Sequence, residues 1–105
     1  MAQVISSDEF NNLVDNIEGI AVVDFFATWC GPCKMLAPVF QEVGNELEGK
    51  AKFYKVDIDQ SLDIARQFNV STVPTVIIFK NGEAIERLVG FMPKENLLAK
   101  IKEHI

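Results

Sequence analysis

The chain has 105 residues and a mass of 11.7 kDa, which is the size of one domain. Hydrophobic residues make up 49% of it and charged residues 24%, and this composition excludes a disordered or fibrous chain. Ten Lys and Arg against fifteen Asp and Glu give a net charge of −5 at pH 7, and the first basic residue is Lys34. An acidic chain without a basic stripe predicts that neither nucleic acid nor a membrane is a partner.

No segment has the pattern of an export signal or a membrane span. The region before Lys34 lacks the basic start of a signal peptide, and the longest uncharged run, residues 67–79, is too short to cross a bilayer. Because the chain has only two cysteines, we expect a cytoplasmic protein. In such a reducing compartment a close cysteine pair points to catalysis or metal binding rather than to a structural disulfide. One domain over residues 1–105 is expected.

Periodicity and turn residues predict nine elements in the order βαβαβαββα. The first helix begins with a capping box, Ser6 to Glu9, and is expected to end near Gly19. The second follows the turn Trp29-Cys30-Gly31-Pro32-Cys33, with Pro38 expected to kink it. The expected strands are 3–5, 20–26, 52–57, 75–79 and 83–89, and the later helices are 62–68 and one that begins at Pro93.

These elements predict a mixed sheet with helices on both faces. Early strands separated by helices must run parallel through right-handed crossovers, whereas Asn81-Gly82 predicts an antiparallel hairpin. Two apolar stripes are expected to face the sheet. In the first helix the stripe is Phe10, Leu13, Val14 and Ile17, and in the last it is Leu97, Leu98, Ile101 and Ile105.

Four interpretations compete for Cys30-Gly31-Pro32-Cys33. A structural disulfide that closes so short a loop contributes only about 2 kcal/mol. A zinc site needs four ligands, and His104, the one histidine, is expected at the surface near the C-terminus; no metal is predicted. Two buried free thiols are the third interpretation, although the exposed turn at Gly31 and Pro32 argues against burial. The fourth interpretation is a redox dithiol.

The start of a helix favours the redox dithiol. Free backbone N–H groups and the positive end of the helix dipole stabilise a thiolate, so the pKa of Cys30 should be lowered and Cys30 should be the nucleophile. Cys30 would attack a substrate disulfide, and a more shielded Cys33 would then attack the Cys30 sulfur and release the reduced substrate. Cys33 must lose its proton at that step, so a nearby base is expected.

Asp24 is the candidate base. It lies in the apolar strand 20–26, where burial would raise its pKa and suit it to accept a proton from Cys33, directly or through water. The alternative is a solvated acid at the end of a strand. Lys55, on the following strand, is either the charge partner of Asp24 or a solvated lysine.

Three segments of the chain resemble the thioredoxin family, and the resemblance extends over the whole chain in its length and its order of elements. They are residues 24–34 (DFFATWCGPCK), Val73-Pro74-Thr75 and Lys80-Asn81-Gly82. The resemblance implies an α/β thioredoxin fold, which is a five-stranded mixed sheet flanked by four α-helices in a three-layer sandwich. It also implies a general protein disulfide reductase that acts by dithiol–disulfide exchange and contributes to cell redox homeostasis.

The resemblance assigns roles residue by residue. Cys30 matches the attacking cysteine, Cys33 the resolving cysteine and Asp24 the buried acid, with Lys55 the lysine near it. Gly31 and Pro32 match the pair that tunes how reducing the couple is. The substrate-facing rim is matched by Trp29, Val73, a cis Pro74, Thr75 and Gly90. Without the resemblance, Pro74 would be expected to be trans and Trp29 a partly buried core aromatic.

Two aromatic residues depart from the family pattern. Phe26 stands where many members have tryptophan, and Phe91 follows Gly90 where a small residue is common. Ser71-Thr72 also lack the basic or glycine residue that some members have before Val73. These differences bear on which proteins dock and leave the dithiol chemistry unchanged.

Three functions are compatible with these observations. The first is a monomeric cytosolic reductase that binds no cofactor and is recycled by a thioredoxin reductase linked to NADPH or ferredoxin, because the chain has no nucleotide-binding glycine motif. The second is an oxidase or isomerase of the same fold, which Gly31-Pro32 and the missing export signal disfavour. The third is a redox-independent binding module, a hypothesis that the intact cysteine pair together with Asp24 makes unnecessary.

Overall fold

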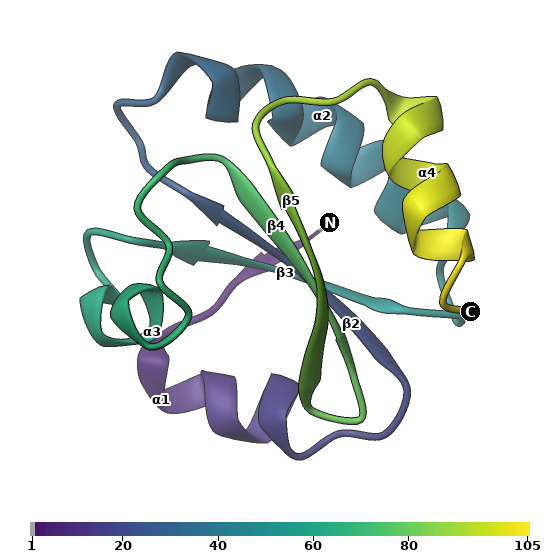
Figure 1. Ribbon diagram of the computed structural model, residues 1–105, viewed down its shortest axis with the longest axis horizontal. Coiled ribbons are helices and arrows are strands. Elements are labelled where there is room, and N and C mark those ends of the chain that lie inside the picture. The colour runs from purple at the N-terminus through teal and green to yellow at the C-terminus, as the bar shows by residue number, and fades with distance from the viewer. Residues whose placement is uncertain (1) are drawn as a thin grey trace.

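The computed structural model describes residues 2–105 and has a five-stranded mixed sheet between two layers of helices (Figure 1). The strands are β1 (Gln3–Val4), β2 (Ile20–Phe26), β3 (Lys52–Asp57), β4 (Thr75–Lys80) and β5 (Glu83–Val89). The helices are α1 (Ser7–Phe10), which continues as the π-helical η1 (Asn11–Asp15), then α2 (Gly31–Glu46), α3 (Leu62–Gln67) and α4 (Lys94–Lys102). The predicted fold class and element order are therefore confirmed.

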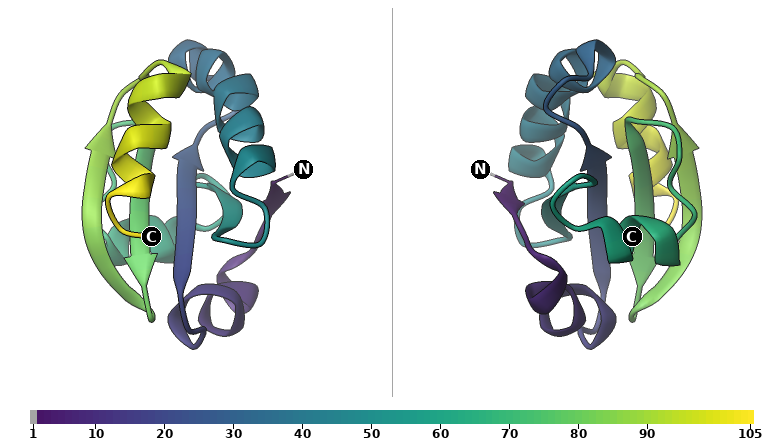
Figure 2. Two further views of the ribbon diagram at one scale, coloured as in Figure 1. Left: turned by 90° about the vertical axis from the view of Figure 1, so that its right-hand side faces the viewer. Right: turned by 90° about the vertical axis from the view of Figure 1, so that its left-hand side faces the viewer.

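The strand order is β1-β3-β2-β4-β5, so β3, β2 and β4 lie inside the sheet and β1 and β5 form its edges (Figure 2). β1 and β2 each pair with β3 in parallel, as expected for strands joined by helices. β4 is antiparallel to both β2 and β5. Because β2 has a partner on each side and a helical layer on each face, its first six residues are buried, as its apolar sequence, interrupted only by Asp24, predicts.

Two cores cover the two faces of the sheet. One core lies between the sheet and the α1 and α3 layer, and it contains Phe10, Val23, Phe25 and Phe79. The other lies between the sheet and the α2 and α4 layer, and it contains Val22, Phe40, Ile78 and Leu97. Successive residues of β2 and β4 point to opposite faces, so the same two strands contribute to both cores.

The first helix differs from the prediction. Its capping box is present, and Phe10 and Val14 are buried with Leu13 and Ile17 packed against the same core. However, the helix widens into a π-turn, closed by the Asn16 N–H to Asn11 O bond of 3.0 Å, and ends at Asp15 rather than near Gly19. The physical reason lies in the hairpin. Gly19 N–H donates to Asn81 Oδ1 and Gly19 O accepts from Asn81 N–H, which directs the chain into β2 before another helical turn forms.

The segment that contains α3 does not return the chain to the opposite end of the sheet, so β4 runs antiparallel to β3. β4 starts at the same end of the sheet at which β3 stops, because Phe26↔Asp57 and Phe25↔Thr75 are paired there. With six residues, α3 is only about 9 Å long and does not carry the chain back along a strand of about 20 Å. The parallel pattern therefore ends with β3.

The last helix is shorter than its apolar residues predict. Leu97 and Ile101 are fully buried and Leu98 packs against the same core. Ile105 lies three residues beyond the end of α4 and is 52% exposed, so the prediction that it shares one helix face with Leu97 and Ile101 was wrong. Pro38 lies inside α2, as predicted.

Candidate functional site: a disulfide at the start of α2

Residues from three chain segments meet at one end of the sheet, where the parallel strands β2 and β3 finish. The turn from β2 into α2 brings Cys30 and Cys33, and the segment before β4 brings Val73. Ala27 and Ile58 complete this apolar cluster. Ligand and active sites of open α/β sheets collect at such an edge, because the loops that leave the strands converge there.

Cys30 and Cys33 form a disulfide, with their Cα atoms 5.3 Å apart. Gly31 and Pro32 are exposed, as expected for the turn, but Cys30 and Cys33 are only 5% and 4% exposed. The inference that an exposed turn keeps the cysteines from being buried was therefore wrong. The turn bulges outward, while both side chains point inward against Ala27, Ile58 and Val73.

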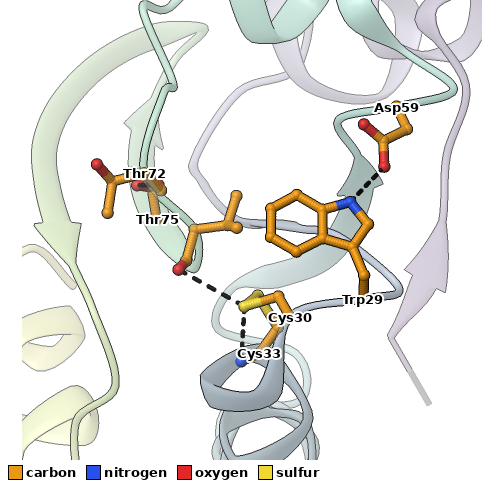
Figure 3. The surroundings of a disulfide bond; sticks show 7 residues. Trp29, Cys30, Cys33, Asp59, Thr72 and Thr75 are labelled. Atoms are coloured by element: carbon orange, nitrogen blue, oxygen red, sulfur yellow. Dashed lines mark hydrogen bonds between the residues drawn. A yellow bond between two sulfur atoms is a disulfide. The ribbon is translucent and has the colours of Figure 1, made fainter.

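The helix start presents a hydrogen-bond donor to the first sulfur. Cys30 is the N-cap residue of α2, and its Sγ accepts a hydrogen bond of 3.2 Å from the Cys33 N–H (Figure 3). On the other side, the Val73 carbonyl oxygen lies 3.6 Å from Cys30 Sγ. An N-cap position that normally holds a Ser or Asp oxygen is thus occupied by sulfur, where an N–H group and the helix dipole both favour a negative charge.

Asp24 is fully buried in β2, at 0% exposure. Neither of its carboxylate oxygens has a hydrogen-bond partner among residues 2–105. Burial raises the pKa of Asp24 from 3.8 to about 6, and the positive charge of Lys55 lowers it in part. Asp24 shares a sheet face with Val22, the face that α2 covers, so it lies on the same side of the sheet as Cys33.

Lys55 lies directly beside Asp24 in the sheet, because the two residues are register partners on β3 and β2. Its ammonium nitrogen lies 4.5 Å from the centroid of the Phe26 ring. The half-buried Lys55 therefore acts on Asp24 through its field rather than as one of the salt bridges found among residues 2–105. Phe26, the aromatic that departs from the family pattern, packs between this lysine and the cysteine cluster.

The residues expected on the substrate-facing rim are not equally accessible. Trp29 is 67% exposed, which contradicts its interpretation as a core aromatic. Val73 is half-buried and precedes a cis Pro74, and the Gly90 N–H donates to the Pro74 oxygen at 2.8 Å.

Thr75 does not reach that surface. It is 1% exposed, and its hydroxyl donates to the Thr72 carbonyl oxygen at 2.5 Å, so the side chain is turned back onto the loop that precedes β4. The expectation that the Thr75 side chain faces substrate is corrected accordingly.

One polar contact of the site was not anticipated from the sequence. The Trp29 indole N–H donates to Asp59 Oδ2 at 2.9 Å, and Asp59 comes from the loop after β3, 30 residues further along the chain (Figure 3). The residues around Asp59 in the sequence do not indicate that it bonds to Trp29. The one available indication was its position just after β3, whose carboxyl end lies next to that of β2.

A second polar cluster lies away from the disulfide. His104 is half-buried, with Nε2 2.6 Å from Glu86 Oε1, and the Lys100 ammonium lies 3.5 Å from the other Glu86 oxygen. Ligand atoms of Glu86, Glu103 and His104 lie within 4.8 Å of one another. The lysine already neutralises Glu86, so this cluster is an ion-pair network that joins β5 to the C-terminal segment. Across residues 2–105, no helix has the length and apolar character required to cross a membrane.

Comparison with known proteins identifies the family. A family model described as Thioredoxin matches residues 1–103. The chain is 49% identical over 96 residues to a thioredoxin of Staphylococcus saprophyticus, a match that covers 90% of the chain and 92% of that relative. It is 42% identical over 101 residues to a thioredoxin of Staphylococcus epidermidis, covering 96% and 95%.

The chain belongs to the thioredoxin family. It is a general protein disulfide oxidoreductase, and it reduces substrate disulfides by dithiol–disulfide exchange through the Cys30–Gly31–Pro32–Cys33 pair. As in the family at large, the redox-active group is the cysteine pair of the chain itself, and the partners are a reductase and proteins with disulfides. The predicted fold and activity are confirmed.

Proposed function

We propose that Cys30 is the attacking cysteine, Cys33 the resolving cysteine and Asp24 the base of this exchange, with Lys55 tuning Asp24. The observation that carries the order of the two cysteines is the hydrogen bond from the Cys33 N–H to Cys30 Sγ. It stabilises charge on the Cys30 sulfur and offers nothing equivalent to Cys33. Cys30 is therefore the thiol that ionises first and reacts first.

In the first step the Cys30 thiolate attacks one sulfur of a substrate disulfide. The substrate S–S bond breaks, a Cys30–substrate disulfide forms, and the other substrate sulfur leaves as a thiolate that takes a proton from solvent. In the second step Cys33 gives its proton to Asp24, directly or through water, and attacks the Cys30 sulfur. The mixed disulfide breaks, the Cys30–Cys33 disulfide forms, and the second substrate sulfur leaves as a thiolate that takes a proton from solvent, so that over the two steps the substrate disulfide has gained two electrons and two protons.

Asp24 suits this proton transfer because its pKa lies at about 6. A carboxylate with the ordinary pKa of 3.8 is a weaker base. A carboxylate whose pKa lies just below neutral pH is still mostly deprotonated at pH 7 and accepts a proton more readily. The absence of hydrogen-bond partners for both oxygens among residues 2–105 keeps the carboxylate free to receive that proton. The adjacent Lys55 limits how far burial raises the pKa of Asp24, so that the base remains ionised at pH 7.

The substrate-binding rim in this proposal comprises Trp29, Val73, Pro74 and Gly90. Trp29 adjoins Cys30 and is exposed, while the backbone of Val73 stands beside the sulfur, where an extended substrate segment would pair with it. Thr75 contributes by fixing the preceding loop through its bond to the Thr72 oxygen. Gly31 and Pro32, both exposed between the cysteines, would set the reduction potential through the conformation of the turn.

The cellular setting follows from the chemistry. A reductase works only where its disulfide is continually reduced, so we propose a cytoplasmic location and recycling by a thioredoxin reductase linked to NADPH or ferredoxin. Residues 1–105 would act as one domain and as a monomer, because exchange requires the sulfur to be open to large protein substrates.

Single cysteine variants test the order of the two steps. Cys30→Ser should abolish reduction of insulin disulfides, whereas Cys33→Ser should still attack and accumulate a stable mixed disulfide with substrate, visible on a non-reducing gel. A mixed disulfide that accumulates in Cys30→Ser instead would reverse the roles. Binding of a partner that survives Cys30→Ser would identify a redox-independent function.

The reduction potential of the Cys30/Cys33 couple decides the direction of electron flow. A value below the glutathione poise of about −220 to −260 mV, measured by equilibration with a dithiothreitol buffer, is expected for a reductase. Each 30 mV corresponds to about 1.4 kcal/mol, so modest precision suffices. A potential well above the poise would mean that the protein acts as an oxidant or isomerase.

Replacement of the base gives an independent test. Asp24→Asn should slow the resolving step by about 100-fold or more at pH 7, since a positioned general base contributes about 100- to 10,000-fold. The rate should recover as the pH rises toward the pKa of the Cys33 thiol, because hydroxide then removes the proton. An unchanged rate with an unchanged pH profile would exclude Asp24 as the base.

A further inference from the structure

The exposed indole of Trp29 is held in place by a single charged acceptor. Trp29 is the one tryptophan of the chain, and at 67% exposure most of its ring has no packing partner. Its N–H donates to Asp59 Oδ2 at 2.9 Å, and Figure 3 shows the nitrogen edge of the ring turned toward that carboxylate. Hydrogen bonds to an ionised acceptor are about twice as strong as neutral ones, so this contact selects the side-chain rotamer.

The acceptor is itself fixed to the sheet. The Asp59 N–H donates to Asp57 Oδ1 at 2.9 Å, and Asp57, the last residue of β3, is only 7% exposed. Two backbone bonds hold the same loop, from Ile58 N–H to Phe26 O at 3.0 Å and from Ser61 N–H to Asp57 O at 2.8 Å. Asp59 therefore presents its carboxylate from a rigid position, on an element different from the one that carries the cysteines.

We propose that Asp59 is a positioning residue, which holds the Trp29 indole as one wall of the groove that receives the polypeptide around a substrate disulfide. The proposal rests on the assignment of Trp29 to the substrate-binding rim. A protein disulfide arrives with chain on both sides of each sulfur and meets this wall. A small disulfide reaches the Cys30 sulfur without touching it. Asp59 thus favours polypeptide disulfides over small ones.

Asp59→Ala tests the proposal by the contrast between two substrates. Pre-reduced protein is mixed with excess insulin at several concentrations, the samples are acid-quenched and their thiols alkylated, and the oxidised and reduced forms of the protein itself are separated by mass and counted. The half-saturating insulin concentration should rise about 3- to 10-fold while the limiting rate changes less than two-fold, because the wall binds substrate without taking part in the chemistry. The rate with the small disulfide 5,5′-dithiobis(2-nitrobenzoate) should stay within two-fold of the parent rate.

Fluorescence and conservative variants separate positioning from a merely structural role. Because Trp29 is the sole tryptophan, time-resolved anisotropy reports its local motion directly, and the amplitude of that motion should increase in Asp59→Ala. Asp59→Asn retains an acceptor oxygen and should restore the affinity for insulin to within about two-fold. Glu83→Ala removes another exposed carboxylate, at the far end of β5 from the disulfide, and should change neither readout.

Trp29→Phe keeps an aromatic wall but removes the donor, so it should reproduce Asp59→Ala, and the double variant should be no weaker than either single variant. Additive losses in the double variant would overturn the proposal. So would an equal loss of rate on insulin and on the small disulfide, or an unchanged affinity for insulin in Asp59→Ala. If Trp29→Ala also leaves insulin affinity unchanged, the assignment of Trp29 to the rim fails as well; if it weakens binding, only the role of Asp59 fails.

Discussion

At the scale of single residues, the burial of Asp24 is energetically unfavourable. A carboxylate at 0% exposure, with no hydrogen-bond partner for either oxygen among residues 2–105, is disfavoured relative to the same group in water. Its pKa of about 6 expresses that penalty, which the field of Lys55 reduces but does not remove. Flanking apolar residues of β2 create the penalty, and the same burial makes Asp24 a useful base. Function and stability are therefore opposed at this position.

Asp24→Asn should consequently stabilise the protein at neutral pH. A carboxyl with a pKa of about 6 in the folded state and 3.8 in its ordinary state binds more protons when folded between those values. The free energy of unfolding therefore falls as the pH rises from about 4 to about 6 and stays lower above that, by about 3 kcal/mol in total. The uncharged amide avoids this fall. Urea unfolding of both proteins should show a gain of about 2–3 kcal/mol at pH 7 and almost none at pH 4.

The matched control for this comparison is Asp8→Asn, at an exposed site in the first turn of α1. It should alter stability by less than about 0.5 kcal/mol at either pH, as surface substitutions usually do. A stability difference between the parent and Asp24→Asn that does not change with pH would mean that the penalty comes from packing and not from the buried charge.

At the scale of elements, the turn between β4 and β5 contacts two segments that precede β2, the end of η1 and Gly19. Asn81 and Gly82 have φ angles of 51° and 82°, the pair of positive values that a type I′ turn requires. The turn also packs on the C-terminal end of η1, where a Cβ on Gly82 would collide with the Asp15 carbonyl oxygen. Asn81 meanwhile exchanges hydrogen bonds with Gly19 and ends the first helical segment.

Gly82→Ala should therefore lower the free energy of unfolding by more than the penalty for a positive φ angle alone. Gly49, with a φ of 83° and no atom near the site of a Cβ, supplies the control, because Gly49→Ala pays only the conformational penalty of about 1–2 kcal/mol. Gly82→Ala adds displacement of backbone at Asp15 and should destabilise by at least 1 kcal/mol more, measured by urea unfolding. Equal losses in the two variants would show that the hairpin moves away from η1 without a cost.

The elements also show what sequence patterns can and cannot predict. The bounds of β2 and β3 were predicted correctly, those of β2 from an apolar run typical of a strand buried on both faces and those of β3 from its alternation of residues. The end of the first helix at Asp15 was not predicted, because the hydrogen bonds between Gly19 and Asn81 that redirect the chain join residues 62 apart. Local propensity carries no information about such a contact.

In the site too, features set by adjacent residues were predictable and features set by distant contacts were not. The N-cap position of Cys30 and the burial of Asp24 follow from adjacent residues and were predictable. The burial of both cysteines and of Thr75, and the bond from Trp29 to Asp59, depend on which loops meet at the end of the sheet. These contacts become visible only when the strand order is known.

At the scale of the whole molecule, the two cores are not independent. Residues 22 and 23 of β2, and residues 77 and 78 of β4, point alternately into the α2 and α4 core and into the α1 and α3 core. Unfolding of either helical layer therefore exposes one face of strands whose other face still carries a core. Because the sheet is shared, partial unfolding forfeits apolar burial without releasing the strands, and this favours a single cooperative transition.

We therefore predict coincident unfolding by two probes that report on different regions. Trp29 fluorescence monitors the disulfide end, and far-ultraviolet circular dichroism monitors the whole backbone; their urea midpoints should agree in the parent protein. Phe10→Ala, in one core, and Leu97→Ala, in the other, each remove a fully buried side chain and should destabilise by about 2–5 kcal/mol. In both variants the two midpoints should move together. If Leu97→Ala shifted the dichroism midpoint and left the fluorescence midpoint in place, the two layers would be separate folding units and residues 1–105 would not behave as one domain.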